Sequence, residues 1–132
     1  MTKKYLAKII ATDSEGLQII SACSTGAKVK VVDIKYLKSS KVFLLSIERT
    51  KVETNQDLKK INSICRFDFV DKVKSKNIDQ KNDKLVLKLI AIDYMKNKDN
   101  YEINLIFSNN CHIALTTEAI EVRLEDQNEI KE

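Results

Sequence analysis

Residues 101–115, with the sequence YEINLIFSNNCHIAL, decide the fold class of this chain. Apolar side chains occupy every second position in residues 101–107 and again in residues 111–115. A two-residue period is typical of a strand that buries one face and exposes the other. The Ser-Asn-Asn segment between the two runs consists of residues that favour turns. The stretch therefore predicts two antiparallel strands joined by a short turn.

The same alternation extends toward the N-terminus through further segments. They are residues 27–37, 42–51, 65–73 and 84–95. The Lys-Ser-Ser-Lys at residues 38–41 is a turn signal, so the first two segments are expected to pair antiparallel. The centre of the chain thus predicts about six antiparallel strands.

The N-terminal part predicts a short strand followed by a helix. Residues 6–11 are a short apolar run, and Thr12 and Glu15 after it have the spacing of a capping box. Apolar residues then recur at helical spacing up to Cys23, and Gly26 lies where a left-handed C-cap is expected. A helix is therefore expected over about residues 13–24.

The C-terminal residues 117–126 carry two competing patterns. Ile120, Val122 and Leu124 alternate as in a strand, but the residues around them are mostly good helix formers that follow a threonine suited to capping. We expect a short helix over about residues 117–126.

These elements indicate an α+β fold, with residues 1–132 in a single domain. The expected architecture is a curved antiparallel β-sheet or partial barrel of about six to seven strands, similar to the pleckstrin-homology (PH) half-barrel, with a helix at each end of the chain. Its expected core consists of Leu17, Ile20, Val31, Leu45, Ile47, Phe67, Phe69, Leu87, Leu89, Ile103, Leu105, Phe107, Ile113 and Leu115.

Composition excludes several classes of protein. No apolar run approaches the roughly 18 to 20 residues that cross a bilayer, so no membrane span is expected. The formal net charge of +4 is too mild for a disordered polyelectrolyte. The cysteines, Cys23, Cys65 and Cys111, are widely spaced and odd in number, which favours reduced thiols over a disulfide framework. A cytoplasmic location is therefore expected.

No group of residues in the sequence has the pattern of a catalytic or cofactor site. His112 is the sole histidine, and Cys111 beside it should point to the opposite face of a strand, so the two are unsuited to sharing one metal ion. Neither Gly16 nor Gly26 lies in a glycine-rich phosphate-binding loop. The sequence therefore assigns no catalytic residue, metal ligand or cofactor.

Lysines are the remaining functional signal. Lysines at alternate positions on strands share a face, so two cationic stripes on one sheet surface are expected to attract a phosphate backbone or an acidic partner. Lysines also protect exposed strand edges from aggregation, which is the competing interpretation. The candidate surface for an anionic partner comprises Lys28, Lys30, Lys35, Lys38, Lys41, Lys72, Lys74 and Lys76.

Several short motifs occur in an order that resembles the bacterial domain-of-unknown-function family 2948. They are residues 6–13, residues 20–22, VKVVDIKYL at 29–37, residues 43–49, residues 66–67 with 73–75, and IEVRLED at 120–126. The resemblance covers nearly the whole chain. It implies a small, stand-alone, cytoplasmic protein of bacteria, and it assigns no activity or catalytic residue.

The favoured hypothesis for function is a non-catalytic binding or adaptor module. Such a module would hold an unknown protein partner through its sheet surface or an exposed strand edge. The first alternative is a nucleic-acid-associated protein that uses the lysine stripes. The second is a small enzyme with a pocket on the concave face of the sheet. The oligomeric state stays open.

Overall fold

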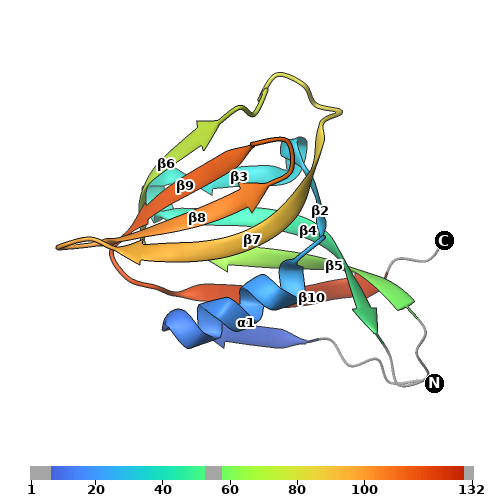
Figure 1. The fold of residues 1–132 in the computed structure, drawn as a ribbon, viewed down its shortest axis with the longest axis horizontal. Coiled ribbons are helices and arrows are strands. Elements are labelled where there is room, and N and C mark those ends of the chain that lie inside the picture. Colours follow the sequence, from blue (N-terminus) through green and yellow to red (C-terminus); the bar gives the residue numbers. More distant parts are fainter. Residues whose placement is uncertain (1–6, 53–57, 130–132) are drawn as a thin grey trace.

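The fold is a strongly curved antiparallel β-sheet with a helix packed beside it (Figure 1). The structure is a computed structural model, and it describes residues 7–52 and 58–129. Its elements, in chain order, are β1 (Lys8–Ala11), α1 (Ser14–Ser24), β2 (Lys28–Lys30), the 3-10 turn η1 (Val31–Asp33), β3 (Ile34–Leu37), the 3-10 turn η2 (Lys38–Ser40), β4 (Val42–Val52), β5 (Leu58–Phe67), β6 (Val70–Lys76), β7 (Val86–Lys96), β8 (Tyr101–Phe107), β9 (His112–Thr117) and β10 (Val122–Glu129).

The strands of the described chain form one 10-stranded sheet in two halves. The order is β1-β10-β5-β4-β2-β7-β8-β9-β6, and β3 also pairs with β4. Strand β2 links the halves, because one of its edges pairs with β4 and the other pairs with β7. Figure 1 shows β6, β9, β8 and β7 in the upper half and β4, β5, β10 and β1 in the lower half.

A corner at residues 68 and 69 joins the two halves a second time. Here β5 turns into β6, and the segment from β9 to β10 turns beside it. The backbone N–H of Asp68 donates to the C=O of Glu121 (3.0 Å), and the N–H of Glu118 donates to the C=O of Phe69 (3.1 Å). Phe69 has a φ of 59°, in the left-handed region, which allows the sharp change of direction. The corner splits the expected strand 65–73 into two strands.

The expected count of six to seven strands with two helices is wrong. The described chain has 10 strands in its sheet. Besides the corner, two other features raise the count: the turn η1 separates β2 from β3, and β10 occupies the segment expected to be helical.

The expected C-terminal helix over residues 117–126 is wrong, because this segment contributes the strand β10. β10 pairs with β1 along one edge and with β5 along the other. Val122 and Leu124 are buried between these partners. Pairing on both edges and burial of one face outweigh the helix propensity of the intervening residues. Without this helix, the comparison with a PH half-barrel loses its basis.

Helix α1 occupies most of the expected segment 13–24, and its N-cap is Asp13 rather than Thr12. The Asp13 carboxylate accepts a hydrogen bond from the backbone N–H of Gly16 (2.8 Å), which satisfies one of the free donors of the first turn. The helix spans 11 residues. No helix in the described part of the chain has both the length and the apolar character that a bilayer span requires.

The helix covers an open side of the sheet between β1 and β7. Leu17 and Ile20 are fully buried on its inner face. The backbone N–H of Ile92 in β7 donates to the Ser21 hydroxyl (2.9 Å). Because β7 pairs irregularly with β8 near residue 90, this bond satisfies an amide beside the irregularity.

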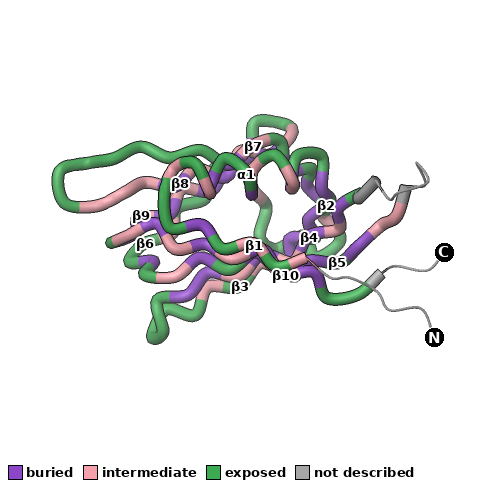
Figure 2. The backbone as a smooth tube through the Cα atoms, turned by 90° about the horizontal axis from the view of Figure 1, so that it is seen from below, coloured by how far each residue is buried: buried purple, intermediate pink, exposed green. Residues whose placement is uncertain are grey.

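The core lies between the two halves of the sheet. Along most strands, buried residues alternate with residues that are partly or fully exposed, as Figure 2 shows by purple segments between pink or green ones. The expected core is confirmed with one exception: Phe69, at the corner, is 43% exposed. The other expected members are all buried.

A buried ion pair extends the inner face of β4, β5 and β10. The Arg49 guanidinium donates from Nη2 to both carboxylate oxygens of Asp126 (2.9 Å each). The Ser63 hydroxyl donates to Asp126 Oδ1 (2.6 Å), and the backbone N–H of Ala7 donates to Oδ2 (2.9 Å). The carboxylate therefore ties the segment before β1 to the other end of the chain.

These contacts lower the pKa of Asp126 below its ordinary value. Burial on its own would raise the pKa, because it disfavours the charged carboxylate. Hydrogen bonds from Ser63, Ala7 and Arg49, together with the positive charge of Arg49, outweigh burial. The folded state thus holds Asp126 as a carboxylate.

Cys65 is expected to resist thiol reagents in the folded protein. Burial raises the pKa of its thiol from 9.0 to about 12, so its thiolate fraction falls by about a thousandfold at neutral pH. Cys23 is only partly buried and serves as the internal control. Iodoacetamide followed by mass spectrometry of peptides should show modification of Cys23 first, and of Cys65 only after unfolding. Equal labelling of both thiols in the native protein would contradict this expectation.

Candidate functional site

The candidate lysines on β2 and those on β6 lie on strands that are far apart in the order of the sheet. Those on β2 are separated from those on β6 by β7, β8 and β9. The two expected stripes therefore do not lie on neighbouring strands of the sheet. Their positions are Lys28 and Lys30 on β2, Lys35 on β3, Lys38 in η2, Lys41 directly after η2, and Lys72, Lys74 and Lys76 on β6.

Lys41 is already engaged within the protein. Its Nζ lies 2.9 Å from Glu118 Oε1 and 3.0 Å from Asp71 Oδ1. The hydrogen bond to Glu118, followed by that to Asp71, raises the pKa of Lys41 above its ordinary value. Lys41 therefore helps to hold the corner and does not offer a free charge.

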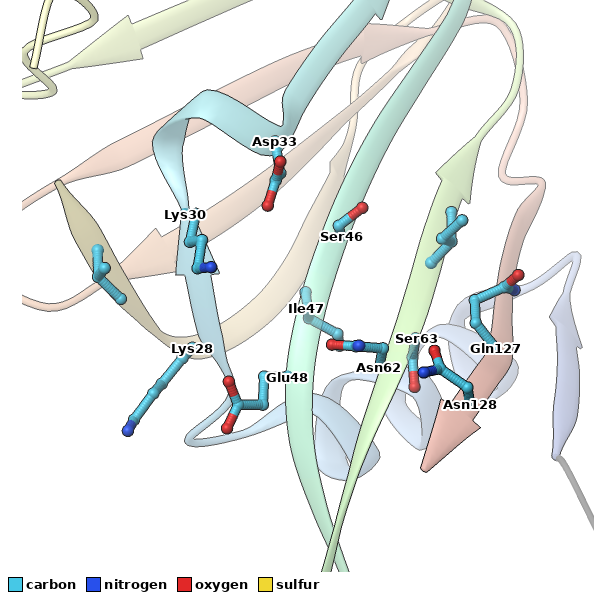
Figure 3. Close-up of a pocket in the computed structure, with 12 residues that line it drawn as sticks. Lys28, Lys30, Asp33, Ser46, Ile47, Glu48, Asn62, Ser63, Gln127 and Asn128 are labelled. Carbon is cyan, nitrogen blue, oxygen red and sulfur yellow. The ribbon is translucent and has the colours of Figure 1, made fainter. Parts of the chain in front are cut away.

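The β2 lysines line a groove of about 430 Å³ on the outer side of the sheet (Figure 3). Asp33 and Glu48 line the same groove, and Glu48 is the register partner of Lys28. Carboxylates and ammonium groups in one groove offset each other. Uncharged amides complete much of the lining: Asn62, Gln127 and Asn128. This groove is mixed in charge and does not form a basic surface.

A second cavity, of about 530 Å³, lies between β3 and β6, and we call it the β3–β6 cleft. Two hydrogen bonds close one end: the Tyr36 hydroxyl donates to the C=O of Val70 (2.9 Å), and the N–H of Val70 donates to the C=O of Lys41 (2.8 Å). Beyond that end the two strands do not pair. The lining is Val31, Val32, Ile34, Tyr36, Phe43, Val73, Ser75, Ile78, Gln80 and Ile113.

The cleft is mostly apolar and reaches the core. Phe43 and Ile113, which line it, are 1% and 3% exposed. The polar lining residues bond to each other, because the Gln80 amide donates to the Ser75 hydroxyl (2.9 Å). Its volume falls within the roughly 300 to 1,000 Å³ that is usual for ligand sites.

Both strands that border the cleft have a free edge. β3 pairs with β4 and β6 pairs with β9, and neither has a second strand partner in the described chain. Backbone N–H and C=O groups along a free edge can pair with an added strand. The cleft therefore lies between two edges that can accept hydrogen bonds from another chain.

Lysines flank the cleft on both sides. On each strand they alternate with the residues that line the cavity, so they point to the outer face. None of them forms an ion pair with a described residue. These flanking lysines are Lys35 on β3 and Lys72, Lys74 and Lys76 on β6, all exposed.

Comparison with known proteins assigns the family. A family model described as "Protein of unknown function (DUF2948)" matches residues 7–132. The chain belongs to the DUF2948 family. No curated protein and no solved structure matches it.

Other reactive side chains of the DUF2948 chain are occupied by structural contacts. His112 Nε2 lies 2.9 Å from Asn104 Oδ1, and the Cys111 thiol donates to the C=O of Asn77 (3.2 Å). In residues 7–52 and 58–129, no cluster of three or more His, Cys, Asp or Glu side chains is arranged to hold a metal ion.

The sequence of this DUF2948 protein draws attention to its lysines but does not reveal the cleft that four of them flank. Tyr36 and Val70, which close the cleft, are 34 residues apart, so no local pattern joins them. A weak signal was present in residues 73–83, where Val73 and Ile78 are the apolar residues of an otherwise polar segment. Both line the cleft.

Proposed function

We propose that this protein is a non-catalytic binding module of the cytoplasm that holds an acidic polypeptide at the β3–β6 cleft. One observation carries the proposal: an apolar cavity lies between two free strand edges, and exposed lysines without ion-pair partners flank it. Apolar side chains of a ligand can enter the cavity while its carboxylates meet the lysines. The free thiols of Cys23, Cys65 and Cys111 support a reducing compartment.

The surroundings of the cleft favour a polypeptide over a nucleic acid. Single-stranded nucleic acids stack their bases on exposed aromatic rings. The cleft has two aromatic lining residues: Phe43 is 1% exposed, and Tyr36 is held by the hydrogen bond from its hydroxyl to Val70. Arginine, whose planar group suits phosphate, does not flank the cleft; the cations there are lysines. Free strand edges offer backbone amides and carbonyls, which a polypeptide can match.

The cavity also distinguishes ligand binding from protection of the edges. Lysines that only prevent edge-to-edge aggregation need no apolar cavity behind them. An enzyme would require a nucleophile or a titratable pair in the cleft. The described lining contains no His, Cys, Asp or Glu, and its serine hydroxyl is bonded to Gln80.

The proposal predicts that reversing the β6 charges abolishes binding of an acidic polymer. Wild-type protein should bind poly-L-glutamate, and binding should weaken as salt rises. The triple substitution Lys72→Glu, Lys74→Glu, Lys76→Glu should weaken binding by more than about tenfold, because three attractive contacts become repulsive. Fluorescence anisotropy with a labelled polymer at two salt concentrations measures both effects.

The matched control reverses three lysines on the strands β2 and β7: Lys28→Glu, Lys30→Glu and Lys88→Glu. Lys28 and Lys88 are register partners on β2 and β7. Both triple variants have the same net charge, so net charge alone cannot separate them. Equal loss in the two variants would reject the cleft as the site. Tighter binding of oligothymidylate than of poly-L-glutamate, with the same dependence on the β6 lysines, would show that the cleft binds a nucleic acid and not an acidic polypeptide.

A further inference from the structure

We infer that the acidic polypeptide binds as an additional strand along β6, with acidic and apolar side chains alternating along it. The inference rests on the proposed function and specifies the recognition pattern. It follows from three features of the cleft: the lengths of the free edges, the two faces of β6, and the closed end at Val70.

The lengths of the edges favour β6 over β3 as the strand that accepts the ligand. β6 has 7 residues and β3 has 4. Paired backbone contacts accumulate along the strand, so the longer edge supports more hydrogen bonds. Strand β3, with its exposed Lys35, then forms the opposite wall.

The two faces of β6 dictate what the ligand must present. Val73 and Ser75 line the cleft, whereas the lysines at positions 72, 74 and 76 are exposed on the outer face. An added strand has the same two-residue alternation, and its side chains lie beside those of its neighbour on each face. Every second ligand residue therefore enters the apolar cavity toward Phe43 and Ile113, and the residues between them lie beside lysines.

The closed end limits the length of the ligand. Val70 is already bonded through its N–H to Lys41 and through its C=O to Tyr36. The edge that remains runs from Lys72 to the end of β6 at Lys76. A matching ligand segment is therefore about five to seven residues long, given one residue opposite each strand position.

Two synthetic peptides test the alternation directly. The first is Glu-Val-Glu-Val-Glu-Val-Glu and the second is the block peptide Glu-Glu-Glu-Glu-Val-Val-Val; both are acetylated at the N-terminus and amidated at the C-terminus, so they have the same composition and charge. We expect the alternating peptide to bind about tenfold more tightly or better, because only it places valines in the cavity and carboxylates beside the lysines at once. Hydrogen exchange should slow at the backbone amides of β6 when this peptide binds, and stay unchanged at those of β1.

Two single variants separate the faces without disturbing the fold. Val73→Thr keeps the shape of a half-buried side chain and makes it polar. It should lower the affinity for the alternating peptide about fivefold and leave the affinity for the block peptide unchanged. Lys74→Gln should lower the affinity for both peptides. Urea unfolding of each variant verifies that the sheet is intact.

The outcomes distinguish this inference from the function on which it rests. Equal affinities for the two peptides, or slowed exchange at other strands only, would overturn strand addition on β6. The proposed function would still stand if poly-L-glutamate bound through the β6 lysines. Absence of binding by both peptides and by the polymer would overturn both.

Discussion

Replacing Asp126 by Ala is expected to lower the free energy of unfolding by about 3 to 5 kcal/mol. The substitution removes the carboxylate that Arg49 contacts with two hydrogen bonds of 2.9 Å, and the Arg49 side chain is only 7% exposed. A buried guanidinium without a counter-charge is costly because water cannot replace the lost partner. The Ser63 hydroxyl and the Ala7 N–H lose the same acceptor. Urea unfolding at pH 7 measures the change.

Two variants serve as controls for this prediction. Asp93→Ala removes an exposed carboxylate from β7 and should change stability by less than about 0.5 kcal/mol. The double variant Arg49→Met, Asp126→Leu removes both charges, so it should be more stable than Asp126→Ala alone. If Asp126→Ala costs less than about 1 kcal/mol, the ion pair does not contribute in the way its geometry indicates.

The same network gives the pH dependence of stability a definite sign. The folded-state pKa of Asp126 is lower than its ordinary value, so the unfolded chain binds this proton more readily. The stabilisation is therefore fully present above the unfolded-state pKa of roughly 3.9 and is lost as the pH falls through the folded-state pKa. Below about pH 4, wild-type protein should lose stability more steeply than Asp126→Asn, which has no carboxyl group to titrate.

Replacing Phe67 by Ala is expected to cost about 3 to 5 kcal/mol, because it opens a cavity in the core. Phe67 is 0% exposed, and its ring packs edge-on against that of Phe43 with the centroids 6.0 Å apart. The two residues are register partners on β5 and β4. The substitution therefore removes a cross-strand side-chain contact as well as core packing. Thermal or urea unfolding measures the loss.

Phe69, two positions along, is the matched control. It is 43% exposed and lies at the corner with a positive φ, so Phe69→Ala should change stability by less than about 1 kcal/mol. Similar losses for Phe67→Ala and Phe69→Ala would contradict the assignment of one to the core and the other to the surface.

The period-two pattern predicted the strands well where one face is buried and the chain runs straight. It failed at Phe69. The apolar alternation of residues 65–69 predicts a buried Phe69, but the chain turns a corner there through a left-handed backbone conformation. At the C-terminus the alternation of Ile120, Val122 and Leu124 indicates the strand correctly, and the helix propensity of the residues between them is the misleading signal. Strand pairing on both sides of β10 is a long-range property that local propensity does not contain.

The same alternation could have located the buried ion pair. Extending the inward parity of Phe43, Leu45 and Ile47 by two positions reaches Arg49. Extending that of Val122 and Leu124 in the same way reaches Asp126. Opposite charges at two inward positions indicate a buried pair, although the sequence does not show that the strands are close. The alternation does not indicate the β3–β6 cleft, because the cleft depends on two strand edges that approach each other without pairing.

Strand β1 pairs with β10, and this has a consequence for how the chain is made. Ala7 and Asp126, which bond to each other, are 119 residues apart. At a synthesis rate of roughly 5 to 20 residues per second, β1 waits on the order of ten seconds on the ribosome before its partner exists. The nascent N-terminal segment therefore emerges with an unsatisfied apolar face. A chaperone that shields such segments should raise the yield of native protein more than it does for a domain whose first strand pairs with the second.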